Sequence, residues 1–203
     1  MEIRTLPVGM LEVNCYLLWH PRTSHALILD PGDETDVILD AVRQLRLDVR
    51  GILLTHTHVD HIRGVGVVAV ALGVPVWVHA ADLPMYRSPL NALPPWLPAA
   101  ADLPEPVAQP PQVEGLPFTV IETPGHSPGG VCFYFAGAGV LFSGDTLFQG
   151  SVGRTDLPGG DAAALQCSLA RLLRELPPET RVLPGHGPET TMAAEAASNP
   201  YLT

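Results

Sequence analysis

Apolar runs of strand length alternate with longer segments at helical spacing through the first part of the chain. The segment 33–47 opens with acidic residues and then repeats apolar side chains every three or four positions, as an amphipathic helix does. The same reading predicts strands at 3–7, 13–19, 26–29, 51–54 and 75–79, and helices at 33–47 and 62–72. This alternation of strands and helices indicates an α/β fold.

The later part of the chain repeats the order of strands followed by a helix. Its predicted strands are 118–122, 131–135, 139–142 and 180–183, and its predicted helices are 161–175 and 189–197. Asp161 is the expected N-cap of the first of these helices. Between the two parts lies a proline-rich segment, 82–112, which predicts either a semi-rigid flap over a site or an extended surface strap.

Composition narrows the class of protein. A chain of 203 residues with 46% hydrophobic content predicts a single domain over 1–203 with a substantial core. No apolar run reaches the roughly 18 residues of a membrane span, and no signal peptide is visible, so a cytoplasmic protein with no membrane partner is expected. The net charge of −10, without any lysine, also argues against a nucleic-acid partner. These features leave the oligomeric state open.

The cysteines predict reduced thiols. There are 3 of them, none in a C-X-X-C pair, and Cys15 and Cys132 lie in predicted strands. We expect these two to be buried as small apolar side chains, and none to be a metal ligand.

Four candidate metal ligands follow directly after the predicted strand 51–54. They are His56, His58, Asp60 and His61. They are expected on the loop at the carboxyl end of that strand, where α/β sheets place their sites. Such a set can surround one metal or be shared between two, and imidazole with carboxylate suits Zn, Fe or Mn better than Ca or Mg.

Three further candidates follow later apolar runs, each in a setting of Gly or Pro that lets the backbone turn sharply. They are His126 in Gly-His-Ser-Pro-Gly, Asp145 in Ser-Gly-Asp-Thr and His186 in Pro-Gly-His-Gly. Together with the first four they resemble the metallo-β-lactamase superfamily, with all seven ligand positions filled in order.

The resemblance implies a four-layer αββα sandwich of two mixed sheets with helices outside. It also implies a ligand set: His56, His58 and His126 for a first metal, Asp60, His61 and His186 for a second, and Asp145 bridging them. Asp60 and Asp145 would then serve catalysis by holding two divalent ions (Zn, or Fe or Mn) with a hydroxide between them. Asp30, in an Asp-Pro-Gly turn, is expected to orient a residue of the metal loop.

The segment 146–156, with Pro184 to Thr190 and Asn199-Pro200, resembles the short glyoxalase II-like hydrolases, assigned as hydroxyacylglutathione hydrolases. This implies cleavage of a small-molecule thioester such as S-lactoylglutathione. The chain lacks the C-terminal helical extension with which full-length glyoxalase II grips glutathione, so another thioester or thiol carrier stays open. Arg154 is expected either to pair with a substrate carboxylate or to form a buried structural pair, for example with Asp156.

The main alternative is a persulfide dioxygenase, which the same segment also resembles. It would use a single Fe(II) held by His56, His126 and Asp145. Val152 argues against it, because the dioxygenase pattern is expected to carry cysteine there. A lactonase and a non-catalytic metal-bound module are lesser alternatives. A β-lactamase is disfavoured because Asp145 stands where such an enzyme would carry cysteine, and because His61 is present.

Overall fold

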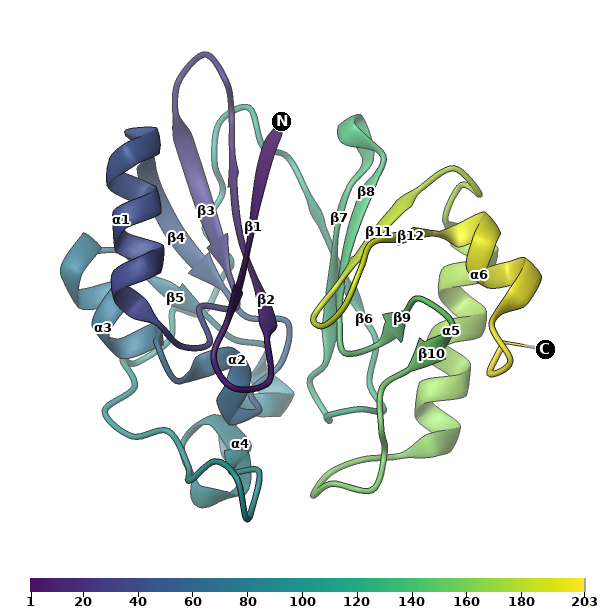
Figure 1. Ribbon diagram of the computed structural model, residues 1–203. Coiled ribbons are helices and arrows are strands. Elements are labelled where there is room, and N and C mark those ends of the chain that lie inside the picture. The colour runs from purple at the N-terminus through teal and green to yellow at the C-terminus, as the bar shows by residue number, and fades with distance from the viewer. Residues whose placement is uncertain (203) are drawn as a thin grey trace. The chain divides into compact units, whose positions relative to one another are not determined.

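The computed structural model describes residues 1–202, and the chain divides into two compact units, Met1–Pro117 and Phe118–Thr203. Each unit contains a mixed sheet with helices on one face (Figure 1). The α/β class and the mixed sheets predicted from the sequence are therefore confirmed. Among the described residues, no helix is long and apolar enough to cross a membrane.

The sheet of the first unit has the strand order β1-β2-β3-β4-β5. The pairs β1·β2 and β2·β3 are antiparallel, whereas β3·β4 and β4·β5 are parallel. The strands are β1 (Glu2–Val8), β2 (Val13–Trp19), β3 (His25–Leu29), β4 (Asp48–Leu53) and β5 (Val76–Trp77). The helices are α1 (Thr35–Leu45), α2 (Val59–Ile62), α3 (Val65–Leu72) and α4 (Leu83–Tyr86), with 3-10 turns η1 (Ala80–Asp82) and η2 (Pro89–Asn91).

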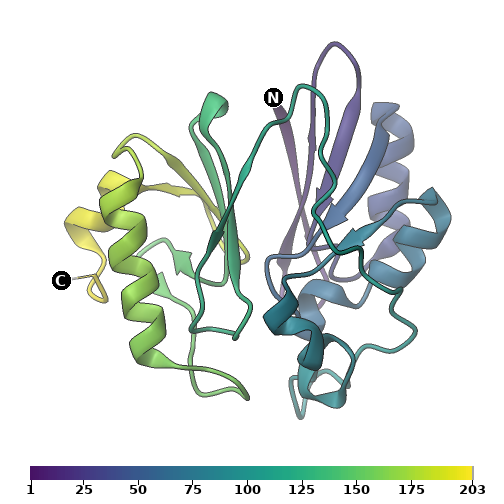
Figure 2. The ribbon, with the colours of Figure 1, turned by 180° about the vertical axis from the view of Figure 1, so that it is seen from behind.

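Helices α1 and α3 cover one face of this sheet (Figures 1 and 2). Ile38 and Val42 of α1 and Val68 of α3 pack with strand residues such as Leu17 and Ile52 in one core. Ile38, Val68, Leu17 and Ile52 are fully buried, which is why the helices hold their places on the sheet.

The second unit has a sheet of order β12-β11-β8-β7-β6 and a small two-stranded ribbon, β9-β10. In the larger sheet β11·β8 is parallel and the other pairs are antiparallel. Its strands are β6 (Thr119–Glu122), β7 (Val131–Phe135), β8 (Val140–Gly144), β9 (Leu147–Phe148), β10 (Ser151–Val152), β11 (Arg181–Pro184) and β12 (Thr190–Thr191). Its helices are α5 (Ala162–Glu175) and α6 (Met192–Ser198), and η3 (Ala136–Ala138) turns between β7 and β8.

Helices α5 and α6 lie on the same face of this sheet (Figures 1 and 2). Leu165 and Leu169 of α5 and Met192 of α6 form a core with Leu141 and Val182 of the strands. Asp161 caps α5 as the sequence predicts, since its side chain accepts hydrogen bonds from the backbone of Ala163 and Ala164.

Several boundaries differ from the sequence-based prediction, and two of these differences change the type of element that a segment forms. The predicted helix 62–72 is preceded by a separate helix, α2, so that Asp60 and His61 lie on a helix and not on a loop. Val59 and Ile62 are both fully buried. They are three residues apart, so one helical turn places both side chains on the same buried face. The helix predicted at 189–197 begins later, at Met192, because Thr190–Thr191 pairs with β11 as β12.

Candidate metal-binding residues

In the first unit, the chain leaves β4 and passes four buried ligand-type side chains within one turn and one helix. His56 and His58 precede α2, and Asp60 and His61 lie in it. The His56 ring centroid is 5.0 Å from that of His58 and 4.1 Å from that of His61. His61 Nε2 is 3.7 Å from Asp60 Oδ2. The four side chains predicted as ligands therefore gather at one place in this unit.

Asp30 determines which ring nitrogen His56 and His61 can present to a metal. Its Oδ1 accepts from the Thr55 backbone N–H at 2.8 Å, and its Oδ2 accepts from the Thr55 hydroxyl at 2.6 Å and from His61 Nδ1 at 3.0 Å. Because the Thr55 hydroxyl proton is used on Asp30, its oxygen accepts from His56 Nδ1, which lies 3.1 Å away. In both imidazoles Nε2 is thus the unprotonated ring nitrogen, which is the form that binds a metal.

The turn that carries Asp30 packs directly on α2. A Cβ atom added at Gly32 would lie 1.8 Å from the carbonyl oxygen of Asp60 and 2.4 Å from a methyl of Val13. Glycine is required there because the two backbones approach so closely. The Asp-Pro-Gly turn is thereby held against the helix that carries two of the ligand-type residues.

Asp82 is a contributor that the sequence reasoning did not find. It is fully buried, and its Oδ2 accepts a hydrogen bond of 3.2 Å from the hydroxyl of Thr57, the residue between His56 and His58. The contact joins the start of the proline-rich segment to the metal loop. Asp82 stands 25 residues from Thr57, and no motif marks it in the sequence.

In the second unit, three ligand-type residues follow three strands of one sheet. His126 follows β6, Asp145 follows β8 and His186 follows β11. Because β8 and β11 are parallel neighbours, their carboxyl ends meet at the same sheet edge. Asp145 Oδ2 lies 3.6 Å from His126 Nε2 and 3.8 Å from His186 Nε2. One carboxylate oxygen is thus flanked by two imidazoles.

These distances fit shared coordination of a divalent metal. Zn–N and Zn–O bonds are both about 2.0–2.2 Å, so two donor atoms on one ion are at most about 4.3 Å apart. The separations of 3.6, 3.7 and 3.8 Å found within the two units meet that limit. Imidazole and carboxylate donors are also those that Zn, Fe and Mn accept. Each unit therefore offers a donor set that fits a transition metal.

The backbone after the β9-β10 ribbon orients His126. His126 Nδ1 is 2.8 Å from the carbonyl oxygen of Arg154, and since a carbonyl can only accept, Nδ1 is the donor. Nε2 is left facing Asp145. A Cβ atom added at the preceding residue, Gly153, would lie 1.8 Å from the carbonyl oxygen of Asp145, so this position also requires a close backbone approach.

The Arg154 side chain does not form the buried pair that the sequence analysis considered. Its Nε and Nη2 donate to the two carboxylate oxygens of Asp156, each at 2.6 Å, but the two side chains are 54% and 67% exposed. The hydrogen bonds from Arg154 lower the pKa of Asp156 to about 2. An exposed pair of this kind leaves the guanidinium accessible to a second carboxylate.

The chain matches a family model described as the metallo-beta-lactamase superfamily over residues 8–186. The chain belongs to the metallo-β-lactamase superfamily. Within this superfamily it is 37% identical to the probable metallo-hydrolase YqgX of Bacillus subtilis, over 100% of this chain and 98% of that protein. It is 34% identical to the hydroxyacylglutathione hydrolase GloC of Haemophilus influenzae, over 100% of this chain and 98% of that protein.

Solved structures of the superfamily share its fold. The crystal structure of the BLEG-1 B3 metallo-beta-lactamase matches with a TM-score of 0.91 and 35% identity over 100% of both chains. TTHA1623 in a di-iron-bound form matches with a TM-score of 0.87 and 45% identity, over 98% of this chain and 100% of that one. ETHE1 from Myxococcus xanthus matches with a TM-score of 0.79 and 29% identity, over 98% of this chain and 84% of that one. The metallo-β-lactamase type of fold expected from the sequence is confirmed.

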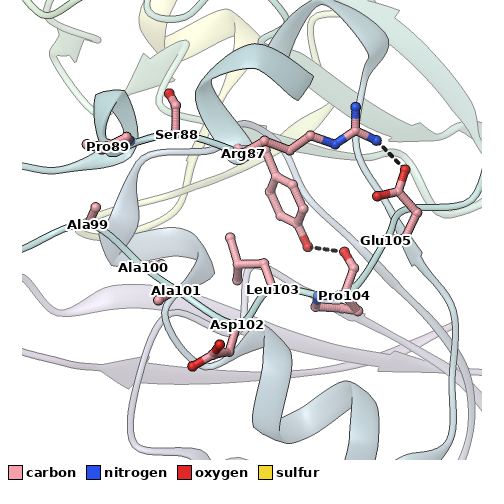
Figure 3. A pocket seen from close by; sticks show the side chains of 11 residues that line it. Arg87, Ser88, Pro89, Ala99, Ala100, Ala101, Asp102, Leu103, Pro104 and Glu105 are labelled. Atoms are coloured by element: carbon pink, nitrogen blue, oxygen red, sulfur yellow. Dashed lines mark hydrogen bonds and ion pairs between the residues drawn. The ribbon is translucent and has the colours of Figure 1, made fainter.

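The proline-rich segment of this superfamily member combines a compact part with an extended part. Tyr86, Arg87 and residues 99–105 line an open cavity of about 470 Å³, across which Arg87 pairs with Glu105 and the Tyr86 hydroxyl donates to the Pro104 carbonyl at 2.9 Å (Figure 3). Further along, Val107 N–H donates to Val76 of β5 at 2.8 Å. The segment has the form of a strap in its second half. Its action as a flap stays a prediction.

Proposed function

We propose that the protein is a metal-dependent hydrolase with two metal ions, and that it cleaves a thioester such as S-lactoylglutathione. The observation that carries the proposal is the position of Asp145, whose Oδ2 lies between the imidazoles of His126 and His186. In the assignment implied by the family, these two histidines belong to different metals. A carboxylate oxygen between them is suited to bridge two ions.

The proposed ligand set is the one that the family implies. His56, His58 and His126 would bind one ion, Asp60, His61 and His186 the other, and Asp145 both. A pair of divalent ions lowers the pKa of a bound water towards neutrality and polarises a carbonyl group. Asp30 would keep His56 and His61 in the tautomers that present Nε2, and the Arg154 carbonyl would do the same for His126.

Two observations and one chemical argument support the thioester. The chain is 34% identical to a hydroxyacylglutathione hydrolase over its whole length. Thiolate is a good leaving group, so the site needs an activated water and stabilisation of the oxyanion but no strong general acid. The exposed guanidinium of Arg154 can bind a substrate carboxylate with two parallel hydrogen bonds.

A second candidate, the persulfide dioxygenase with one Fe(II), is supported by the likeness to ETHE1 from Myxococcus xanthus. His56, His126 and Asp145 would be its ligands. Val152 favours the hydrolase, because the dioxygenase pattern is expected to carry cysteine there. The likeness to BLEG-1 adds a β-lactam to the substrates that need testing, since the same hydrolytic chemistry can open a lactam.

The variant Asp145→Ala tests the proposal. It should lower the metal content and abolish thiol release from S-lactoylglutathione, because the shared carboxylate is lost. Asp40→Ala is the control, since Asp40 is an exposed residue of α1 that pairs with Arg43. Elemental analysis and a thiol-release assay measure the two effects, with glutathione persulfide and a β-lactam as competing substrates. Full activity in Asp145→Ala would refute the assignment.

A further inference from the structure

Glu195 of α6 is a buried carboxylate far in sequence from every ligand-type residue except His186. It is 2% exposed. Its Oε2 accepts from the Gly150 backbone N–H at 2.8 Å and from Asn199 Nδ2 at 2.7 Å, and its Oε1 accepts from the Thr190 hydroxyl at 2.6 Å. A carboxylate can be buried at tolerable cost when it is hydrogen-bonded in this way.

The three donors come from three separate segments of the second unit. Gly150 is in the turn between β9 and β10, Thr190 is in β12, and Asn199 follows the last turn of α6 (Figure 1). Asn199 is itself fully buried and also donates to the carbonyl of Ser151 at 3.0 Å. An apolar residue at position 195 would let α6 pack without burying a charge. The carboxylate therefore serves to hold the β9-β10 ribbon and β12 to α6.

The ribbon that Glu195 holds reaches two of the ligand-type histidines. At its start, the Phe148 ring stands edge-on to the ring of His186, with centroids 6.3 Å apart. Two residues beyond its end, the carbonyl of Arg154 accepts the Nδ1–H of His126 at 2.8 Å. A shift of the ribbon would therefore displace both the Phe148 ring beside His186 and the Arg154 carbonyl that binds His126.

We infer that Glu195 is a positioning residue for the metal centre, acting through the β9-β10 ribbon on His126 and His186. The inference rests on the proposed metal centre but not on the thioester as substrate. Loss of the Glu195 carboxylate frees Gly150 and Thr190 from α6, so the ribbon should no longer hold the two imidazoles in one orientation. Partners of this kind typically change metal affinity by about 10–100-fold.

The test compares Glu195→Leu with Thr191→Ala in full-length protein stripped of metal. Leucine is close to glutamate in size but accepts no hydrogen bond, so Gly150, Thr190 and Asn199 all lose their partner at position 195. Thr191 caps the same helix by accepting from Ala194 N–H at 3.2 Å, so its loss weakens α6 without touching the ribbon. Co²⁺ is titrated into each protein and followed by visible absorption, and the melting temperature of the metal-free form is recorded alongside.

Glu195→Leu should bind Co²⁺ about 10–100-fold more weakly than the unchanged protein, with an altered visible spectrum. Thr191→Ala should bind within about twofold of the unchanged protein, whatever its melting temperature. Equal Co²⁺ affinity and spectrum in Glu195→Leu and the unchanged protein would overturn the inference.

A second variant covers the case in which Glu195→Leu does not fold. Asn199→Ala removes the bonds from Asn199 to Glu195, Ser151 and Phe148 but leaves those of Glu195 to Gly150 and Thr190, so a smaller loss of Co²⁺ affinity is expected. Unchanged affinity in Asn199→Ala would contradict the inference. Absence of Co²⁺ binding by the unchanged protein would overturn both the metal centre and this role. Metal binding without thiol release would overturn only the thioester.

Discussion

His126 illustrates how a backbone carbonyl selects the atom that an imidazole offers to a metal. The Arg154 carbonyl takes the Nδ1–H of His126, and Nε2 then faces the carboxylate of Asp145. Asp30 does the equivalent for His61 directly, and for His56 through the Thr55 hydroxyl. Three imidazoles therefore have their tautomer set by groups that are not themselves proposed ligands.

Gly153→Ala tests the close backbone approach behind Asp145. The added methyl would lie 1.8 Å from the Asp145 carbonyl oxygen and 3.2 Å from Cβ of His126, so both must shift. We expect a loss of about 1–3 kcal/mol in the free energy of unfolding together with reduced metal content. Urea unfolding and elemental analysis measure these effects.

Gly137→Ala is the matched control for that variant. Nothing lies within 4 Å of a Cβ atom added at Gly137, and its φ is not positive. It should unfold and bind metal like the unchanged protein. If both glycine variants behave alike, steric crowding at Gly153 is not what holds Asp145 in place.

Arg154→Ala separates substrate binding from stability. Alanine keeps the backbone carbonyl that orients His126, and an exposed ion pair adds little to stability, so the melting temperature should change little. We expect KM for S-lactoylglutathione to rise several-fold with kcat nearly unchanged. Arg171→Ala, which breaks an exposed pair with Glu175 on α5, is the control. A fall in melting temperature with normal kinetics would make Arg154 a structural residue.

At the scale of elements, the long apolar strands were predictable and the short elements were not. The strand 13–19 was predicted with the bounds that β2 has, because its side chains are almost all buried. The strands β9, β10 and β12 have 2 residues each, and α2 and α4 have 4, too few to show a period. They are formed by contacts with distant segments, such as that of Gly150 with Glu195.

The candidate site was predictable to a similar extent. The first four of its seven ligand-type residues come directly after a predicted strand, and the last three follow later strands in Gly or Pro turns, which the sequence displays. The side chains that orient them do not carry such a signal. Thr55 and Asp82 each make their decisive contact with a residue 25 positions away, and Glu195 meets Gly150 across 45.

Asp161→Ala tests whether the N-cap of α5 stabilises the protein without affecting metal binding. Its side chain accepts from Ala163 N–H at 2.9 Å and Ala164 N–H at 3.0 Å, whereas its own N–H donates to Gly125 and survives the change. We expect a loss of about 0.5–2 kcal/mol in the free energy of unfolding, with metal content unchanged. Asp161→Ser should restore most of the loss, and no recovery in that variant would argue against a capping role.

At the scale of the whole molecule, each of the two units builds a mixed sheet with helices on one face and offers its own set of ligand-type side chains. The family model spans both units, from residue 8 to 186. Ligand loops at the ends of strands are thus a property that both halves of the chain share.

The two buried thiols, Cys15 and Cys132, should make the folded protein less stable at alkaline pH. Burial raises the pKa of Cys132 to about 11, and it raises that of Cys15 as well. From about pH 9 the unfolded chain releases protons that the folded chain keeps, so the free energy of unfolding falls as the pH rises further. Urea unfolding at pH 7.5, 9 and 10 should show this fall, and Cys132→Ala should reduce its slope. An equal slope in the two proteins would contradict the assignment to Cys132.

The central claim is that the protein holds two metals and hydrolyses a thioester. Elemental analysis of protein purified without chelator, paired with thiol release from S-lactoylglutathione, tests it most directly. We expect nearly two metal ions per chain and release of the thiol. One iron per chain, no thiol release, and oxygen uptake with glutathione persulfide would contradict the claim and establish the dioxygenase instead.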